Sequence, residues 1–140
     1  MTLKQFALAG TFVTALVAAP TAQTPQPPAQ TQTTPAVVTV TLDEWKVEMS
    51  STTLQAGPTT FKTTNVAKGT HTLKVESQKL DDPKAKKISQ ELPHDLKKGE
   101  SGEVTIDLKP GTYQAICPIG LGIHKRRGML QAFTVVAKTH

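Results

Sequence analysis

The sequence predicts an all-β protein, a Greek-key antiparallel β-sandwich, and three observations support this fold class. Short segments rich in β-branched residues recur between turn-forming residues from position 37 onward, and several of them alternate apolar with polar side chains. Helical periodicity is scarce, which favours packed sheets. The segment 108–113, LKPGTY, contains the only tyrosine of the chain and resembles the tyrosine corner of Greek-key sandwiches.

Residues 1–22 have the features of a secretory signal peptide. Lys4 gives a short positively charged start, and Phe6 to Ala19 is an apolar and small-residue run that is too short for a secure membrane span. Small residues up to Ala22 offer a cleavage site, so we expect no membrane span in the mature chain. An uncleaved N-terminal anchor is the alternative. Export predicts a periplasmic or extracellular location.

Residues 23–36, QTPQPPAQTQTTPA, are predicted to form a disordered linker. The segment has no charge and no large apolar side chain, so it cannot bury enough surface to offset the entropy of ordering. The remaining residues, 37–140, suit a single domain. The predicted organisation is therefore a signal peptide, a Pro/Gln/Thr-rich linker and one β-domain.

The alternation of side chains within the domain predicts its strands in order. They are expected at 37–42, 45–49, 59–66, 71–77, 102–108, 112–117 and 130–137. With a period of two, His71, Leu73 and Val75 share one face of their strand, which would be the interior face. The charged segment 78–98 is expected to be a long loop with a short helix over 84–90. His94, within this loop, is expected to be solvated.

Four side chains of the domain are candidate metal ligands. Cys117 is the only cysteine, His124 follows it after six intervening residues, Met129 follows after four more, and His71 lies far upstream. A lone cysteine is most often a buried small hydrophobic residue. A thiolate, two imidazoles and a thioether together, however, are the ligands of a blue-copper electron-transfer site. Their order, with Pro and Gly bending the intervening loop, favours the metal site.

The expected compartment gives a second argument for metal binding. With one cysteine the chain can form no internal disulfide, although an exported protein is in a compartment that permits disulfides. A free thiol in such a compartment is exposed to oxidation, so its presence needs an explanation. Metal ligation supplies one, because it holds the sulfur as a bound thiolate.

The segment 111–129, GTYQAICPIGLGIHKRRGM, resembles the copper loop of the cupredoxins, the plastocyanin and azurin family, in its Cys–His–Met order. His71 matches the place of the histidine that this family carries on an early strand. The resemblance covers nearly all of the predicted domain and implies the cupredoxin Greek-key sandwich, with one type 1 copper ion held by His71, Cys117, His124 and Met129. It also implies that Cys117 carries most of the covalency with copper, that Met129 is a weak axial donor, and that an electron leaves by the edge of His124.

Three features depart from the family pattern. The spacing between Cys117 and His124 is longer than in plastocyanins or azurins, which leaves the exposure of His124 open. Thr72 stands where many members carry an asparagine that braces the ligand loop. Pro118 has no N–H, so one possible hydrogen bond to the Cys117 sulfur is absent, and fewer such bonds generally raise the reduction potential.

The net charge of +5 and the pI near 9.4 raise the question of nucleic-acid binding. Export and the scarcity of aromatic residues argue against it. Lys125, Arg126 and Arg127 lie between His124 and Met129, beside the expected electron exit. This placement suggests redox partner proteins with acidic docking surfaces. A solvated loop without a partner is the alternative.

These observations predict an exported, monomeric small blue-copper protein that carries single electrons between redox partners. The alternative is a periplasmic copper carrier or chaperone that uses the same ligands without redox turnover. We do not expect an enzyme. A Cys117–His124 nucleophile pair has no evident third group to orient it, and four histidines, one of them the terminal His140, are too few for the extra copper centres of a multicopper oxidase.

Overall fold

The structure, a computed structural model, describes residues 34–139. The predicted signal peptide at 1–22 and most of the predicted linker at 23–36 lie outside these residues, as does His140. The described residues 34–139 belong to one compact unit. Among residues 34–139 there is no helix long and apolar enough to cross a membrane.

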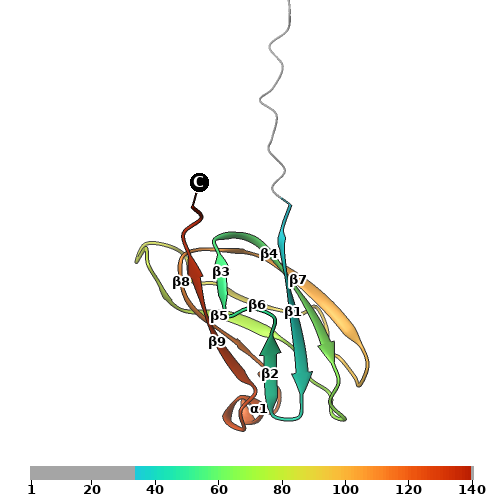
Figure 1. Cartoon of the computed structure of the whole chain (residues 1–140). Helices are drawn as coiled ribbons and strands as arrows, with labels where there is room; N and C mark the ends of the chain where they lie inside the picture. The colour runs from blue at the N-terminus through green and yellow to red at the C-terminus, as the bar shows by residue number, and fades with distance from the viewer. Residues whose placement is uncertain (1–33, 140) are drawn as a thin grey trace, which may run out of the picture. The chain divides into compact units, whose positions relative to one another are not determined.

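The compact unit is built of two packed β-sheets and one short helix (Figure 1). The elements are β1 Ala36–Asp43, β2 Lys46–Met49, β3 Thr53–Gln55, β4 Gly57–Asn65, β5 Lys74–Leu80, β6 Ser89–Glu91, β7 Ser101–Leu108, β8 Gly111–Ile116, α1 Ile123–Arg126 and β9 Leu130–Val136. One sheet has the strand order β2-β1-β4-β7 and the other β3-β9-β8-β5-β6. The structure therefore confirms the predicted all-β sandwich.

Two of the strand pairings differ from an all-antiparallel arrangement. β1 runs parallel to β4, with Val38 opposite Phe61, and β3 runs parallel to β9, with Leu54 opposite Val135. The chain leaves the first sheet after β2, adds β3 to the second sheet, and returns as β4 on the far side of β1. Alternation in the sequence shows which face of a strand is buried, but it does not show which strand lies beside it.

Aromatic rings fill the space between the sheets. Phe133 stacks on Tyr113 with ring centroids 5.3 Å apart and lies 6.0 Å from Phe61. The predicted tyrosine corner is present, because the Tyr113 hydroxyl donates to the Lys109 carbonyl oxygen at 2.7 Å and accepts from the Lys109 N–H at 3.1 Å. These contacts fix the start of β8, the strand that leads to Cys117.

The predicted helix over 84–90 is wrong. Ser77 exchanges backbone and side-chain hydrogen bonds with Ile88, and β6 pairs antiparallel with β5 directly after it. Hydrogen bonds to the edge of β5 therefore outweigh the helix propensity of this lysine-rich segment. Tertiary contacts commonly override local propensity in this way. His94 is exposed, as predicted.

The predicted strand 71–77 begins later than expected. β5 starts at Lys74, and His71 instead forms an isolated bridge with Leu96. The predicted direction of the side chains is nevertheless correct, because His71, Leu73 and Val75 are all buried. The bridge places His71 just beyond the end of the sheet, where the loops of the metal centre meet.

Candidate metal centre

Cys117 comes to the centre at the end of β8. The strand runs antiparallel to β9, and the pairing continues one step beyond it, since the Cys117 N–H donates to the Met129 carbonyl oxygen at 3.1 Å. Both side chains are completely buried. The backbone of one candidate ligand therefore holds the backbone of another.

His71 is positioned by a short loop that Asn65 braces. The Asn65 side-chain amide donates to the carbonyl oxygens of Gly69 and Leu96, each at 2.8 Å, and its oxygen accepts from the Ala67 N–H at 3.0 Å. Two backbone hydrogen bonds join His71 to Leu96, at 3.0 and 2.7 Å. Asn65 is fully buried at the end of β4, so it connects the loop before His71 to the segment that pairs with it.

His124 lies in α1, which accommodates the long spacing after Cys117. Gly120, Leu121 and Gly122 have positive φ angles of 68°, 53° and 79°, and they fold the chain back into the helical turn. The Met129 N–H then donates to the His124 carbonyl oxygen at 3.1 Å. The additional residues are thus taken up by a compact turn that returns the chain to the base of the site.

The candidate ligand atoms converge on one point. The Nδ1 atoms of His71 and His124 are 3.1 Å apart, and the Cys117 sulfur lies 3.7 Å from the first and 3.5 Å from the second. One ligand atom from each of the three residues lies within 4.8 Å of the others. Both imidazoles turn the same nitrogen, Nδ1, toward the thiol. This soft N₂S donor set fits copper. Met129, the fourth residue predicted from sequence, is buried, and its backbone contacts both Cys117 and His124.

Burial sets the protonation of these groups. Burial raises the pKa of the Cys117 thiol, while hydrogen bonds from the backbone of Thr72 and Ile119 act in the opposite direction. Burial and the neighbouring charge of His124 lower the pKa of His71. His71 is therefore kept in the neutral form that binds metals, whereas Cys117 must release a proton to become a ligand.

Pro118 has no N–H to donate to the Cys117 sulfur, as expected. The backbone of Thr72 and of Ile119 nevertheless acts to lower the pKa of the Cys117 thiol, against the larger effect of burial. The Thr72 hydroxyl is buried and makes no hydrogen bond among residues 34–139, so it does not brace the ligand loop. Asn65, which the sequence analysis did not single out, performs that role.

Trp45 covers the other side of the site and was also missed. It occupies the turn between β1 and β2 with a positive φ of 62°, and its ring meets that of His124 edge-on at a centroid distance of 5.3 Å. The Arg127 guanidinium lies 4.4 Å from the Trp45 ring centroid. Gly128 makes this packing possible, because a Cβ there would lie 2.8 Å from the Trp45 carbonyl oxygen. His124 is consequently half-buried.

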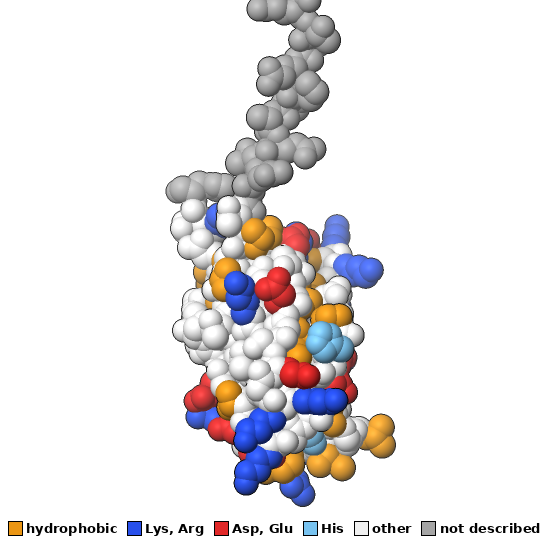
Figure 2. All heavy atoms as spheres, turned by 90° about the vertical axis from the view of Figure 1, so that its right-hand side faces the viewer, with side chains coloured by type: hydrophobic (Ala, Val, Ile, Leu, Met, Phe, Trp, Pro, Cys, Tyr) orange, Lys and Arg blue, Asp and Glu red, His pale blue; other side chains and the backbone are white. Residues whose placement is uncertain are grey.

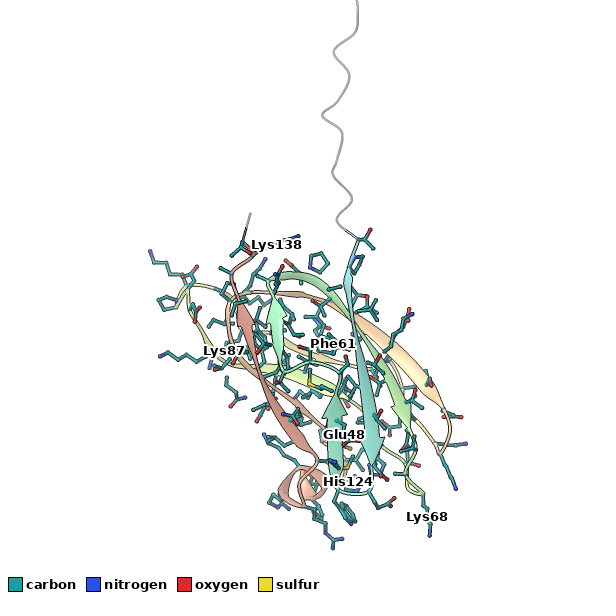
Figure 3. All side chains as sticks on the ribbon, in the orientation of Figure 1. Glu48, Phe61, Lys68, Lys87, His124 and Lys138 are labelled. Atoms are coloured by element: carbon teal, nitrogen blue, oxygen red, sulfur yellow. The ribbon has the colours of Figure 1, made fainter. Side chains whose placement is uncertain are left out.

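The basic residues next to His124 have different environments. The Lys125 ammonium lies 3.4 Å from a carboxylate oxygen of Glu76, so its charge is partly neutralised. Arg126 and Arg127 are exposed. Leu121 is 98% exposed in the same loop. Figure 2 shows basic and hydrophobic side chains side by side at this end of the sandwich, and Figure 3 shows His124 and Lys68 at the end away from Lys138.

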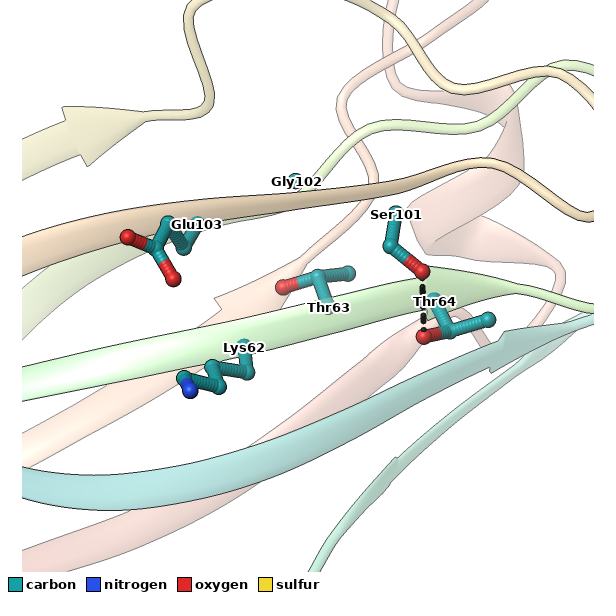
Figure 4. Close-up of a pocket in the computed structure, with 6 residues that line it drawn as sticks. All are labelled: Lys62, Thr63, Thr64, Ser101, Gly102 and Glu103. Atoms are coloured by element: carbon teal, nitrogen blue, oxygen red, sulfur yellow. Dashed lines mark hydrogen bonds between the residues drawn. The ribbon is translucent and has the colours of Figure 1, made fainter.

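A surface recess with a volume of about 330 Å³ lies between β4 and β7 and is drawn in Figure 4. Its polar lining is tied together by a hydrogen bond of 2.8 Å between the Thr64 and Ser101 hydroxyls. None of the residues lining it is a candidate metal ligand. This recess therefore belongs to the β4–β7 side of the domain and not to the candidate metal centre.

A scan against protein-family models and a search of curated proteins both find no match. Solved structures do match. An auracyanin from Roseiflexus castenholzii is 16% identical with a TM-score of 0.54, over 72% of this chain and 97% of that one. Auracyanin A from Chloroflexus aurantiacus, described as a "blue" copper protein, is 21% identical with a TM-score of 0.51, over 72% of this chain and all of that one, 100%.

A multi-copper oxidase from Pseudomonas thermotolerans also matches, with 17% identity and a TM-score of 0.50, over 73% of this chain but only 30% of the oxidase. At these identities the likeness concerns the fold. The chain has the cupredoxin β-sandwich, as its sequence predicted. The ligand set and the function are argued from the site.

Proposed function

We propose that the protein is an exported blue (type 1) copper protein that carries single electrons between redox partners. The observation that carries this proposal is the convergence of the Cys117 sulfur and the Nδ1 atoms of His71 and His124 within 4.8 Å. Met129 is proposed as the residue that would supply the fourth ligand, because it is buried and its backbone contacts both Cys117 and His124. The fold shared with auracyanin A, a "blue" copper protein, supports the proposal.

A bound copper ion would supply one-electron chemistry by alternating between two oxidation states. The residues of this chain supply a rigid frame. Backbone hydrogen bonds hold His71 to Leu96 and Cys117 to Met129, and neither pair has to move when the charge of the site changes. A frame that needs little rearrangement keeps the barrier to electron transfer low. The half-buried His124, beneath Trp45, is the proposed route to the surface.

Metal binding also involves a proton. Because burial raises the pKa of the Cys117 thiol, the metal-free protein holds this proton at neutral pH. Binding must displace it, so apparent copper affinity should increase as pH rises toward the thiol pKa. The same burial argues against a nucleophilic enzyme, since a reactive cysteine has a lowered pKa and an accessible sulfur, while Cys117 is 0% exposed.

The proposed partners are redox proteins with acidic surfaces. Arg126 and Arg127 are exposed beside His124, where they would attract such a surface. Export through the segment 1–22 and action as a monomer belong to the same proposal. They are tested by locating the protein in fractionated cells and by measuring its mass in solution.

Cu(II) titration of the full chain tests the copper site. One equivalent should bind and give an intense thiolate-to-copper band in the visible spectrum, and Cys117→Ser should abolish the band. His94→Gln is the matched control, because His94 is exposed and is not part of the converging group. A colourless complex, or colour that persists in Cys117→Ser, contradicts the proposal. Binding with rapid loss of copper to a chelator would instead indicate a copper carrier.

A further inference from the structure

His71 has one ring nitrogen that the metal centre does not use. Its Nδ1 faces the Cys117 sulfur and His124, while its Nε2 is buried and has no hydrogen-bond partner among residues 34–139. An imidazole that binds a metal through Nδ1 carries its proton on Nε2. Metal-binding histidines almost always donate this proton to a carboxylate, a carbonyl or a water molecule. An acceptor close to Nε2 is therefore expected.

Glu44 supplies a carboxylate oxygen at this place. A Cβ built on Gly69 would lie 3.6 Å from Glu44 Oε1 and 3.6 Å from His71 Nε2, so both atoms border the same small space. Because residue 69 is glycine, no side chain separates them. The negative charge of Glu44 also acts to raise the pKa of His71, against the stronger lowering by burial and by the charge of His124.

The Glu44 side chain is already anchored on the loop that carries His71. Its other oxygen, Oε2, accepts the Lys68 N–H at 2.9 Å. The Glu44 N–H itself donates to Asp43 Oδ1 at 2.7 Å, which fixes the beginning of the turn, and Trp45 fixes its end by packing on His124. Oε1 makes no hydrogen bond among the described residues, and it borders the same space beside Gly69 as His71 Nε2.

We propose that Glu44 is a positioning residue of the metal centre, whose Oε1 accepts the Nε2 proton of His71 when a metal is bound at Nδ1. The inference rests on the proposed copper site. This hydrogen bond fixes the tautomer and the orientation of the ring. It also makes the imidazole a stronger donor, because a carboxylate partner increases ligand basicity. The turn between β1 and β2 then supports both imidazoles, with Glu44 behind His71 and Trp45 against His124.

Three variants test the proposal in the full chain. Glu44→Ala removes the acceptor, Glu44→Gln keeps an oxygen at the same place without its charge, and Asp43→Asn is the matched control. Asp43→Asn removes one negative charge from the same turn and leaves an oxygen that can accept the Glu44 N–H. Each protein is loaded with Cu(I), which is diamagnetic, and the imidazole protons are observed by NMR. Cu(II) affinity is measured by competition with a chelator.

The wild type and Asp43→Asn should show a slowly exchanging His71 Hε2 proton, which Glu44→Ala should lose. Cu(II) affinity should fall about 10–100-fold in Glu44→Ala, as for other partners of metal-binding histidines. Glu44→Gln should retain the Hε2 signal and recover part of the affinity. If Glu44→Ala matches Asp43→Asn in both measurements, the inference is wrong while the copper site stands. If the wild type binds no copper, the proposed function fails and the inference fails with it.

Discussion

The indole of Trp45 meets the imidazole of His124 at an interplanar angle of 89°, with the ring centroids 5.3 Å apart. The two residues come from opposite ends of the domain sequence, the β1–β2 turn and α1. Arg127 lies on the same indole, so the helix that carries His124 is held to the turn by two contacts. The imidazole of His124, the proposed route for electrons to the surface, is therefore partly covered by the Trp45 ring.

Trp45→Ala should loosen the loop that carries His124. An aromatic pair contributes about 0.5–1.5 kcal/mol and an exposed cation–π contact about 0.5–1 kcal/mol, so loop opening should become about tenfold more frequent. We expect copper loss to a chelator to accelerate accordingly, while the visible band persists because no ligand has changed. Val37→Ala, at an exposed hydrophobic residue near the start of β1, is the control and should leave the rate unchanged. An unchanged rate in Trp45→Ala would show that the contact does not restrain His124.

Asn65→Ala should destabilise the metal-free protein. The substitution removes three hydrogen bonds to buried backbone groups, and at about 1 kcal/mol each the free energy of unfolding should fall by about 3 kcal/mol. Chemical denaturation measures this change. The control is Thr64→Ala on the same strand, which removes one hydrogen bond to Ser101 and should cost about 1 kcal/mol or less. Equal losses in the two variants would contradict a bracing role for Asn65.

Substitution of Met129 should shift the reduction potential in either direction. Met129→Leu keeps an apolar side chain of similar volume in this fully buried position but removes the sulfur donor, so Cu(II) loses more than Cu(I) and the potential should rise. Met129→Gln offers a harder oxygen donor and should lower it. Shifts of about 59 mV, equivalent to a tenfold change for one electron, or more are expected in cyclic voltammetry. Both variants should remain blue, and unchanged potentials would make Met129 a core residue only.

Neutralising Arg126 and Arg127 should slow electron exchange with an anionic reagent at low salt. Hexacyanoferrate(II) is a suitable probe, because its negative charge stands in for an acidic docking surface. The matched control is Lys86→Gln with Lys87→Gln, which removes the same charge from a segment away from His124 (Figure 3). The effect should disappear near 1 M salt, where the Debye length is about 3 Å. If the two double variants react at the same rate, the arginines have no steering role.

The sequence predicted the buried faces of the strands, and it predicted that Cys117 lies beside two histidines, for a physical reason. A period of two determines the buried side of a strand without reference to its neighbours, and Val38, Val40 and Leu42 are accordingly buried on β1. The order of Cys117, His124 and Met129 is likewise local. The parallel pairing of β1 with β4 depends on the path of the chain between sheets, which no local pattern encodes.

The residues that the sequence analysis missed act across long separations. Asn65 is polar at the end of a strand, and only its fully buried state and its hydrogen bond to Leu96 reveal its role. Trp45 was assigned to a strand, whereas its position in a turn against His124 follows from tertiary packing. The helix α1 was not predicted, because the glycines on either side of Leu121 indicate a loop rather than a helix.

The position of β9 in its sheet has a consequence for the order in which the protein assembles. β9 lies between β3 and β8, so β3 has no neighbour in the second sheet until residues 130–136 take their place. Cys117, which is made earlier, obtains its backbone partner Met129 only when that last strand docks. A chain in which this strand has not docked lacks that part of the enclosure of Cys117, which is fully buried in the folded protein. Copper that reaches the folded protein meets the complete set of candidate ligands. An oxidant that reaches the chain before β9 has docked meets a less enclosed cysteine.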